Sequence, residues 1–120
     1  MLNNQSANAE NGMATSTIPI NTSGEKSLDT KFGGGTVKYI KQNGVVSVYL
    51  ANGQLSGMTA NADNSWNSKI PEGFRPPVEA FSRLYSDNGY AYVNTSGTVF
   101  IHPTSASIWA GFCITYVATQ

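Results

Sequence analysis

The stretch "TVKYIKQNGVVSVYL", residues 36–50, decides the fold that the sequence predicts. Two runs rich in β-branched and aromatic residues flank the dipeptide Asn43-Gly44. A two-residue type I′ loop needs positive φ at both positions, which Asn and Gly tolerate better than other residues. We therefore expect an antiparallel hairpin here.

The composition extends this expectation to the whole chain. Ser, Thr, Asn and Gly make up 48 of the 120 residues, and these residue types suit turns but have poor helix propensity. Short strand-like runs recur at intervals of about 8 to 12 residues, and no segment has a sustained helical period. The sequence predicts an all-β domain, either a small antiparallel β-barrel or a jelly-roll-like sandwich of about seven strands.

The chain divides into an arm and one domain. Residues 1–27 have few large apolar side chains and no periodicity, so they bury too little surface to offset the entropy of ordering. We expect a flexible or partner-ordered N-terminal arm at 1–27 and the β-domain at 28–120. The glycines of "FGGG", residues 32–35, predict a bend or bulge before the first hairpin.

The second half of the chain predicts a meander. The runs "EAFSRLYS", "YAYVN" and "TVFIH" are separated by Asn88-Gly89 and by "NTSG", which indicates three consecutive antiparallel strands. Residues 107–118 are largely apolar on both alternating faces, so this last strand is expected to be central and buried on both sides, with Cys113 as a small buried hydrophobe. The polar segment 57–69, which contains Trp66, is expected to be a loop or weak edge strand.

Charge and hydrophobicity exclude several classes of partner. Seven basic and seven acidic residues balance, which disfavours binding to nucleic acid or to an anionic membrane surface. The longest apolar run, "SIWAGFCITYVA", is shorter than the roughly 20 residues of a membrane span, and the N-terminus does not read as a secretion signal. We expect no membrane insertion. With one cysteine in the chain, we expect no internal disulfide.

The segment "SKIPEGFRPP", residues 68–77, can be neither a helix nor an inner strand. Pro71 biases Ile70 toward an extended conformation, and Pro-Glu-Gly fits positions i+1 to i+3 of a type I turn. The final Pro-Pro pair cannot donate to a ladder. We expect a rigid crossover between the Asn43-Gly44 hairpin and the meander, with Ile70 and Phe74 pinned into the core. Arg75 is expected at the surface or as a partner of another subunit.

The same segment carries a family resemblance. "SKIPEGFRPP" is preceded by "GVVSVYLANGQLSG" and followed by "NGYAYVNTSGTVFIH" and "SIWAGFCITYVA". This order resembles the C-terminal head domain of tail and baseplate receptor-binding proteins from phages of Gram-positive bacteria, in which an "lP.gyRP" connector separates a "vv.v.l.G" strand from a "G.v.i....w......Y.a" ending. The resemblance covers roughly residues 35–118. It implies a homotrimeric β-head, displayed at the tail tip of the virion after synthesis in the bacterial cytoplasm, that binds host cell-wall polysaccharide. The arm would then bind other baseplate or tail proteins.

The residue inventory is poor in catalytic chemistry. His102 and Cys113 are the only histidine and the only cysteine, and a buried Cys would be inert as a nucleophile. No G-x-S-x-G elbow is present, and the carboxylates form no suggestive pair for glycoside hydrolysis. We expect no enzyme activity, no cofactor and no metal. The "NADN" segment at 61–64 is expected to be a polar turn rather than a calcium site.

Binding chemistry is better represented. A saccharide site needs an aromatic plate together with fixed polar groups. Arg83 is expected to share a strand face with Phe81 and Tyr85 and to need a partner there. The candidate ligand-binding residues are Trp66, Arg83, Asp87, Tyr90, His102 and Trp109.

Several functions stay open at this point. The first is a non-catalytic adhesin for host saccharide, and the second is a structural baseplate part whose arm docks to a neighbouring virion protein. A lyase or hydrolase of host polysaccharide is the third, and a trimeric jelly roll of the C1q or TNF type is the fourth.

Overall fold

The computed structural model describes residues 21–118. Every regular element in this part of the chain is a β-strand, and no helix in it is long and apolar enough to cross a membrane. The strands are β1 Ser23–Lys31, β2 Gly35–Gln42, β3 Val45–Leu55, β4 Asn64–Lys69, β5 Ala80–Arg83, β6 Gly89–Val93, β7 Thr98–Pro103 and β8 Ile108–Val117.

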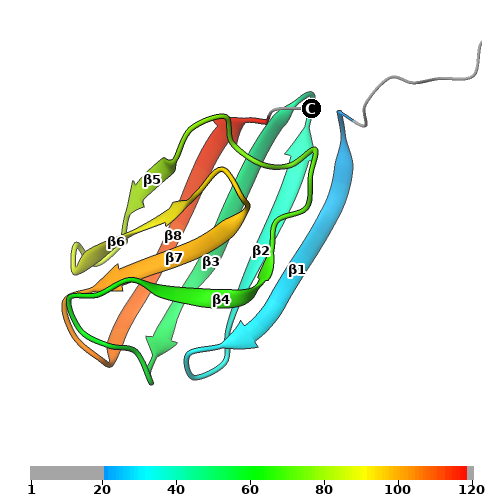
Figure 1. Cartoon of the computed structure of the whole chain (residues 1–120). Helices are drawn as coiled ribbons and strands as arrows, with labels where there is room; N and C mark the ends of the chain where they lie inside the picture. Colours follow the sequence, from blue (N-terminus) through cyan, green and yellow to red (C-terminus); the bar gives the residue numbers. More distant parts are fainter. Residues whose placement is uncertain (1–20, 119–120) are drawn as a thin grey trace, which may run out of the picture.

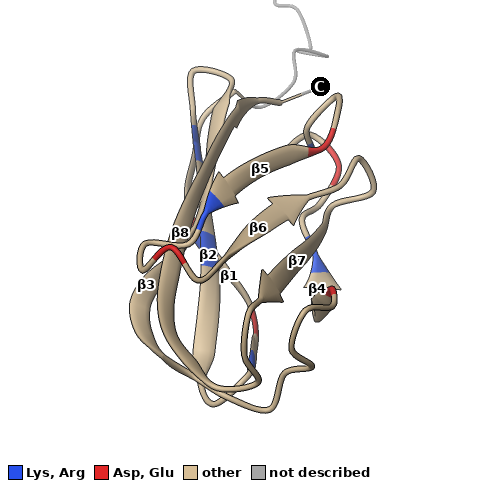
Figure 2. Ribbon diagram, turned by 90° about the vertical axis from the view of Figure 1, so that its left-hand side faces the viewer, with Lys and Arg blue, Asp and Glu red and all other residues tan. Residues whose placement is uncertain are grey.

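The strands form two four-stranded antiparallel sheets that face each other. The first sheet has the order β1-β2-β3-β8 and the second has the order β4-β7-β6-β5. Figures 1 and 2 show the two sheets as separate layers. The all-β prediction is confirmed, and of the two predicted architectures the molecule has the sandwich rather than the closed barrel.

The sequence predicted two parts of the fold correctly, the Asn43-Gly44 hairpin and the meander. Asn43 and Gly44 have φ of 51° and 81°, and they join Gln42 to its partner Val45 in the β2–β3 ladder. Positive φ at both loop positions is what a type I′ turn requires. The predicted meander is also confirmed, because β5 pairs with β6 and β6 pairs with β7.

The core lies between the two sheets and consists of the inward-facing residue of each alternating pair. Its largest fully buried side chains include Trp66, Phe112, Leu55, Ile70, Leu84, Ile101 and Ile114.

The predicted boundary at residue 28 is too late. β1 begins at Ser23, and its register runs from Ser23 opposite Lys41 to Lys31 opposite Gly35. Residues 23–27 therefore form part of the first sheet although their sequence, "SGEKS", has no strand pattern. The remainder of the predicted arm, residues 1–20, lies outside the described residues.

The prediction for the last strand is wrong. β8 is the edge of the first sheet, and only its inner face is buried. On its outer face Trp109 and Val117 are 55 % and 66 % exposed, and Cys113 is exposed rather than buried. No layer of the described residues covers this face, so an apolar pattern on both faces did not indicate burial on both.

The proline-rich segment runs along one end of the second sheet. It connects β4 to β5, which are opposite edges of the same sheet (Figure 1), so it is not the crossover between hairpin and meander that the sequence predicted. The hydrogen bond from Phe74 N–H to the Pro71 carbonyl (3.1 Å) and the φ of 89° at Gly73 make a type II turn with Gly73 at its third position. The sequence prediction placed a type I turn one residue earlier, with Ile70 rather than Pro71 at its first position.

The predicted pins of this segment are confirmed. Ile70 is fully buried, and Phe74 packs against the core. Two side chains of the first sheet also donate hydrogen bonds to backbone carbonyls of this segment. Buried Lys41 donates from Nζ to the Gly73 carbonyl (2.5 Å), and the Tyr116 hydroxyl donates to the Phe74 carbonyl (2.6 Å). Arg75 donates from Nε to the Ile70 carbonyl (2.8 Å), so it serves the segment's own conformation.

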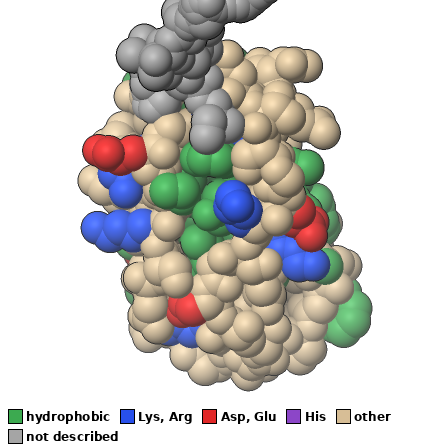
Figure 3. All heavy atoms as spheres, turned by 90° about the vertical axis from the view of Figure 1, so that its right-hand side faces the viewer, with side chains coloured by type: hydrophobic (Ala, Val, Ile, Leu, Met, Phe, Trp, Pro, Cys, Tyr) green, Lys and Arg blue, Asp and Glu red, His purple; other side chains and the backbone are tan. Residues whose placement is uncertain are grey.

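Asp29 joins the two sheets on the β1 side of the molecule. Its carboxylate accepts hydrogen bonds from the backbone N–H (2.7 Å) and the hydroxyl (2.8 Å) of Ser68 on β4. The backbone bond from Ser68 is the main cause that lowers the pKa of Asp29. Figure 3 shows this side, where hydrophobic side chains lie at the surface between charged groups. The Asp29–Ser68 hydrogen bonds thus connect β1 to β4 at this edge of the sandwich.

This arrangement predicts an acid-dependent contribution to stability. Because the folded pKa of Asp29 lies below its unfolded value, its contribution is complete above the unfolded value of about 4 and is lost as the pH falls through the folded pKa. Urea unfolding of the wild type and of Asp29→Asn should differ most at neutral pH and progressively less in acid. A difference that stays constant down to acid pH would contradict the assignment.

Candidate functional site

The outer face of the second sheet carries a row of rings. The strand register places Phe81 of β5 opposite Tyr92 of β6, and Tyr92 opposite Phe100 of β7. In the neighbouring row Tyr90 lies opposite His102. We call these five residues, Phe81, Tyr90, Tyr92, Phe100 and His102, the aromatic face. It is the only exposed cluster of stacked rings among residues 21–118.

Stacking leaves few of these ring faces open to a ligand. Centroids lie 4.8 Å apart for Phe81 and Tyr92 and 4.7 Å apart for Tyr92 and Phe100. Tyr90 and His102 lie 4.7 Å apart with planes only 8° from parallel. Nearly parallel rings at this spacing cover each other, so the inner rings present mainly their edges. On the β5 side the row-end rings are Phe81 and Tyr90, which are 57 % and 37 % exposed.

Two charged side chains flank these open rings. Arg83 lies opposite Tyr90 in the β5–β6 ladder and donates from Nη1 to Asp87 Oδ1 at 2.8 Å. Their side chains are 82 % and 74 % exposed, and a surface ion pair of this kind adds at most about 1 kcal/mol to stability. Both groups can therefore exchange their bond for one to a ligand at low cost.

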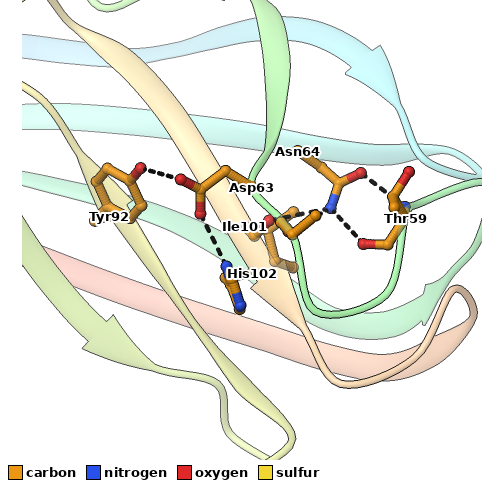
Figure 4. Close-up of polar contacts among 7 residues, drawn as sticks. Thr59, Asp63, Asn64, Tyr92, Ile101 and His102 are labelled. Carbon is orange, nitrogen blue, oxygen red and sulfur yellow. Dashed lines mark hydrogen bonds and ion pairs between the residues drawn. The ribbon is translucent and has the colours of Figure 1, made fainter.

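A second polar group lies at the opposite side of the aromatic face. Asp63, directly before β4, accepts hydrogen bonds from the Tyr92 hydroxyl (2.7 Å) and from His102 Nδ1 (2.9 Å), as Figure 4 shows. The bond from Tyr92 and then the bond from His102 lower the pKa of Asp63. Burial, followed by the bond to Asp63, raises the pKa of the Tyr92 phenol. Tyr92 is therefore a neutral donor and Asp63 an ionised acceptor.

Asn64 fixes the loop that carries Asp63. Its side-chain amide accepts from Thr59 N–H (2.8 Å) and donates to the carbonyls of Thr59 (3.0 Å) and Ala62 (2.9 Å). These bonds close the 59–64 turn (Figure 4), and β4–β7 pairing places Asn64 opposite Ile101. The turn thus places the Asp63 carboxylate within hydrogen-bond distance of His102.

The structure brings four of the six predicted residues to this region: Arg83, Asp87, Tyr90 and His102. It also adds Phe81, Tyr92, Phe100 and Asp63, which the sequence prediction did not include. Alternation along the meander could have found the three rings. Asp63 could not be found in this way, since it lies 39 residues from its partner His102.

Trp66 is not a ligand plate. Its side chain is 2 % exposed, packs edge-on against Phe32 at 5.0 Å and Phe112 at 6.2 Å, and donates from Nε1 to the Gly35 carbonyl at 3.3 Å. Segment 64–69 is strand β4 at the edge of the second sheet, which confirms the edge-strand alternative predicted for this segment, and Trp66 is its inward-facing residue.

Trp109 is exposed but belongs to the other side of the sandwich, on the outer face of β8. Tyr85 also lies apart from the aromatic face. It follows the end of β5, and its N–H donates to Gly111 on β8 at 2.8 Å, so the predicted face shared by Phe81, Arg83 and Tyr85 does not include Tyr85.

The other chemistry in the described residues is limited. Cys113 and His102 lie on different sheets. No three His, Cys, Asp or Glu side chains of residues 21–118 are grouped to hold a metal ion. A hollow of about 450 Å³ lies where β3 departs from β2, lined by Gly33–Thr36, Lys38 and Leu50–Leu55. It contains no aromatic side chain, so it lacks a plate for a sugar ring.

No protein-family model matches the chain, and no curated protein matches it.

Proposed function

We propose that this chain is a non-catalytic saccharide-binding domain, and that it serves as a receptor-binding head in a phage tail or baseplate. The observation that carries the binding proposal is the aromatic face, with open rings at Phe81 and Tyr90 beside the Arg83–Asp87 pair. Sugars offer apolar C–H faces ringed by hydroxyls, which suit an aromatic ring next to charged hydrogen-bonding groups. The phage assignment rests on the motif order described above.

Sites that bind a saccharide weakly can still attach a particle to a cell wall when many copies bind at once. A shallow, exposed site buries little area, so one site binds weakly. Several copies on one particle raise the avidity through effective concentration. The proposed target is host cell-wall polysaccharide, which repeats its units and suits such binding.

The test is co-sedimentation of the pure protein with purified cell walls from a panel of Gram-positive bacteria. We expect retention on the walls of a subset of strains, release by soluble polysaccharide from the same strains, and no release of reducing ends. Retention on no wall, or cleavage of the polysaccharide, would contradict the proposal.

The exposed face of β8 favours a second candidate, a structural role in assembly. Trp109 and Val117 on β8 and Val45 on β3 are exposed apolar side chains on one outer sheet face, as expected of a surface that another subunit covers. We propose that three copies pack through this face, with the N-terminal arm bound to a neighbouring virion protein. The head would then be a baseplate part even without a sugar.

Light scattering tests the trimer. We expect the mass of three 12.8 kDa chains for the wild type and a lower mass for Trp109→Ser combined with Val117→Ser. A monomeric wild type would contradict assembly through β8.

A further inference from the structure

The hydrogen-bond network around Asp63 determines which nitrogen of His102 is free. Asp63 receives the Tyr92 hydroxyl on Oδ2 at 2.7 Å and His102 Nδ1 on Oδ1 at 2.9 Å. An ionised carboxylate only accepts hydrogen bonds, so the hydroxyl and Nδ1 must both donate. A neutral imidazole that carries its proton on Nδ1 has a lone pair on Nε2.

That lone pair belongs to a partly accessible side chain. Nε2 of His102 has no hydrogen-bond partner within residues 21–118, and the side chain is 29 % exposed. The ring lies against Tyr90 with centroids 4.7 Å apart. Only the Tyr90 ring therefore separates a saccharide stacked on the open side of Tyr90 from His102.

We propose that Asp63 is a positioning residue that holds His102 in the Nδ1–H tautomer, and that Nε2 of His102 is the acceptor for a ligand hydroxyl. This inference rests on the proposed function and names the chemistry of the ligand. The sugar must present a free hydroxyl at this position. Glycans that carry a phosphate, an O-acetyl or an O-methyl group there are acceptors only and bind weakly, because the Nε2 lone pair would meet another lone pair.

Asp63→Asn is the decisive variant because it reverses this polarity. The Asn carbonyl can still accept from Tyr92, while its amide donates to His102 Nδ1 and moves the imidazole proton to Nε2. Tyr92→Phe is the matched control. It removes a hydrogen bond from the same carboxylate but leaves the Asp63–His102 bond in place.

The tautomer is read directly from the imidazole ¹⁵N resonances under conditions in which the ring is neutral. We expect a protonated Nδ1 and an unprotonated Nε2 in the wild type and in Tyr92→Phe, and the reverse in Asp63→Asn. An unprotonated Nδ1 in the wild type overturns the inference whether or not a sugar binds.

Binding is then measured with methyl glycosides of glucose, galactose, rhamnose and N-acetylglucosamine as probes. For a probe that binds, we expect the Nε2 resonance to shift and about tenfold weaker affinity for Asp63→Asn than for the wild type. If a probe binds the wild type and Asp63→Asn equally but fails to bind Tyr90→Ala, the inference is overturned and the saccharide site stands. If no probe and no wall polysaccharide binds the wild type, both proposals are overturned.

Discussion

Replacing Trp66 with alanine is expected to lower the free energy of unfolding by about 3 to 5 kcal/mol, the range for deleting a large aromatic side chain from a core. Trp66 is almost fully buried between Phe32 and Phe112, and its Nε1–H serves the Gly35 carbonyl. Natural domains are stable by about 5 to 15 kcal/mol, so this variant should be near the limit of folding. The measurement is urea unfolding followed by circular dichroism.

Two further variants separate the causes. Trp109→Ala removes the same side chain from an exposed position and should change the free energy of unfolding of the single chain by no more than about 0.5 kcal/mol. Trp66→Phe keeps an aromatic ring but loses the Nε1–H, so its cost should be clearly smaller than that of Trp66→Ala. Equal costs for Trp66→Ala and Trp109→Ala, measured at a protein concentration at which the wild type and both variants are monomeric, would show that Trp66 is not a core residue.

Phe81→Ala and Tyr90→Ala are each expected to weaken binding to cell walls about tenfold per site. A sugar that covers about 50 Å² of a ring gains roughly 1.3 kcal/mol from the area removed from water, which is close to a tenfold change in affinity. Both rings are exposed at the end of their rows, so their removal should leave the fold intact. Binding is measured by co-sedimentation, with the circular dichroism spectrum and oligomeric mass checked for each variant.

Tyr85→Ala provides a matched control for these variants. Tyr85 is 59 % exposed, close to the 57 % of Phe81, but it lies outside the aromatic face. It should leave wall binding unchanged. An equal loss of binding for Tyr85→Ala and Phe81→Ala would mean that exposed rings contribute without regard to position, and the proposed site would be wrong.

Much of the fold could be predicted because local chemistry specifies it. Asn43-Gly44 determines its turn through the φ values it tolerates, and the short turn segments between the meander strands indicated that consecutive strands pair. The edge position of β8 could not be predicted, because an apolar outer face looks the same in sequence whether a sheet or another subunit covers it. The edge strand that carries Trp66 was one of the two predicted alternatives, but the burial of Trp66 was not predicted. A single large residue among small polar ones does not show which face of an edge strand is buried.

The candidate site could be predicted only in part. Arg83, Asp87 and Tyr90 lie within one hairpin, and the cross-strand partner of Tyr90 is His102 in the next strand, so short-range pairing brings them together. Asp63 reaches His102 only through the β4–β7 register, which involves strands far apart in the chain. The order in which Phe81, Tyr92 and Phe100 stack, and hence which ring faces remain open, depends on the β5–β6 and β6–β7 registers.

Chemical-shift mapping tests the central claim most directly. Soluble fragments of a cell-wall polysaccharide that retains the protein are titrated into ¹⁵N- and ¹³C-labelled domain. We expect the largest shifts in Phe81, Arg83, Tyr90 and His102, with Trp109 and the β2–β3 hollow unaffected. Shifts confined to β8 or to the hollow, with the aromatic face unchanged, would contradict a saccharide site on the outer face of the second sheet.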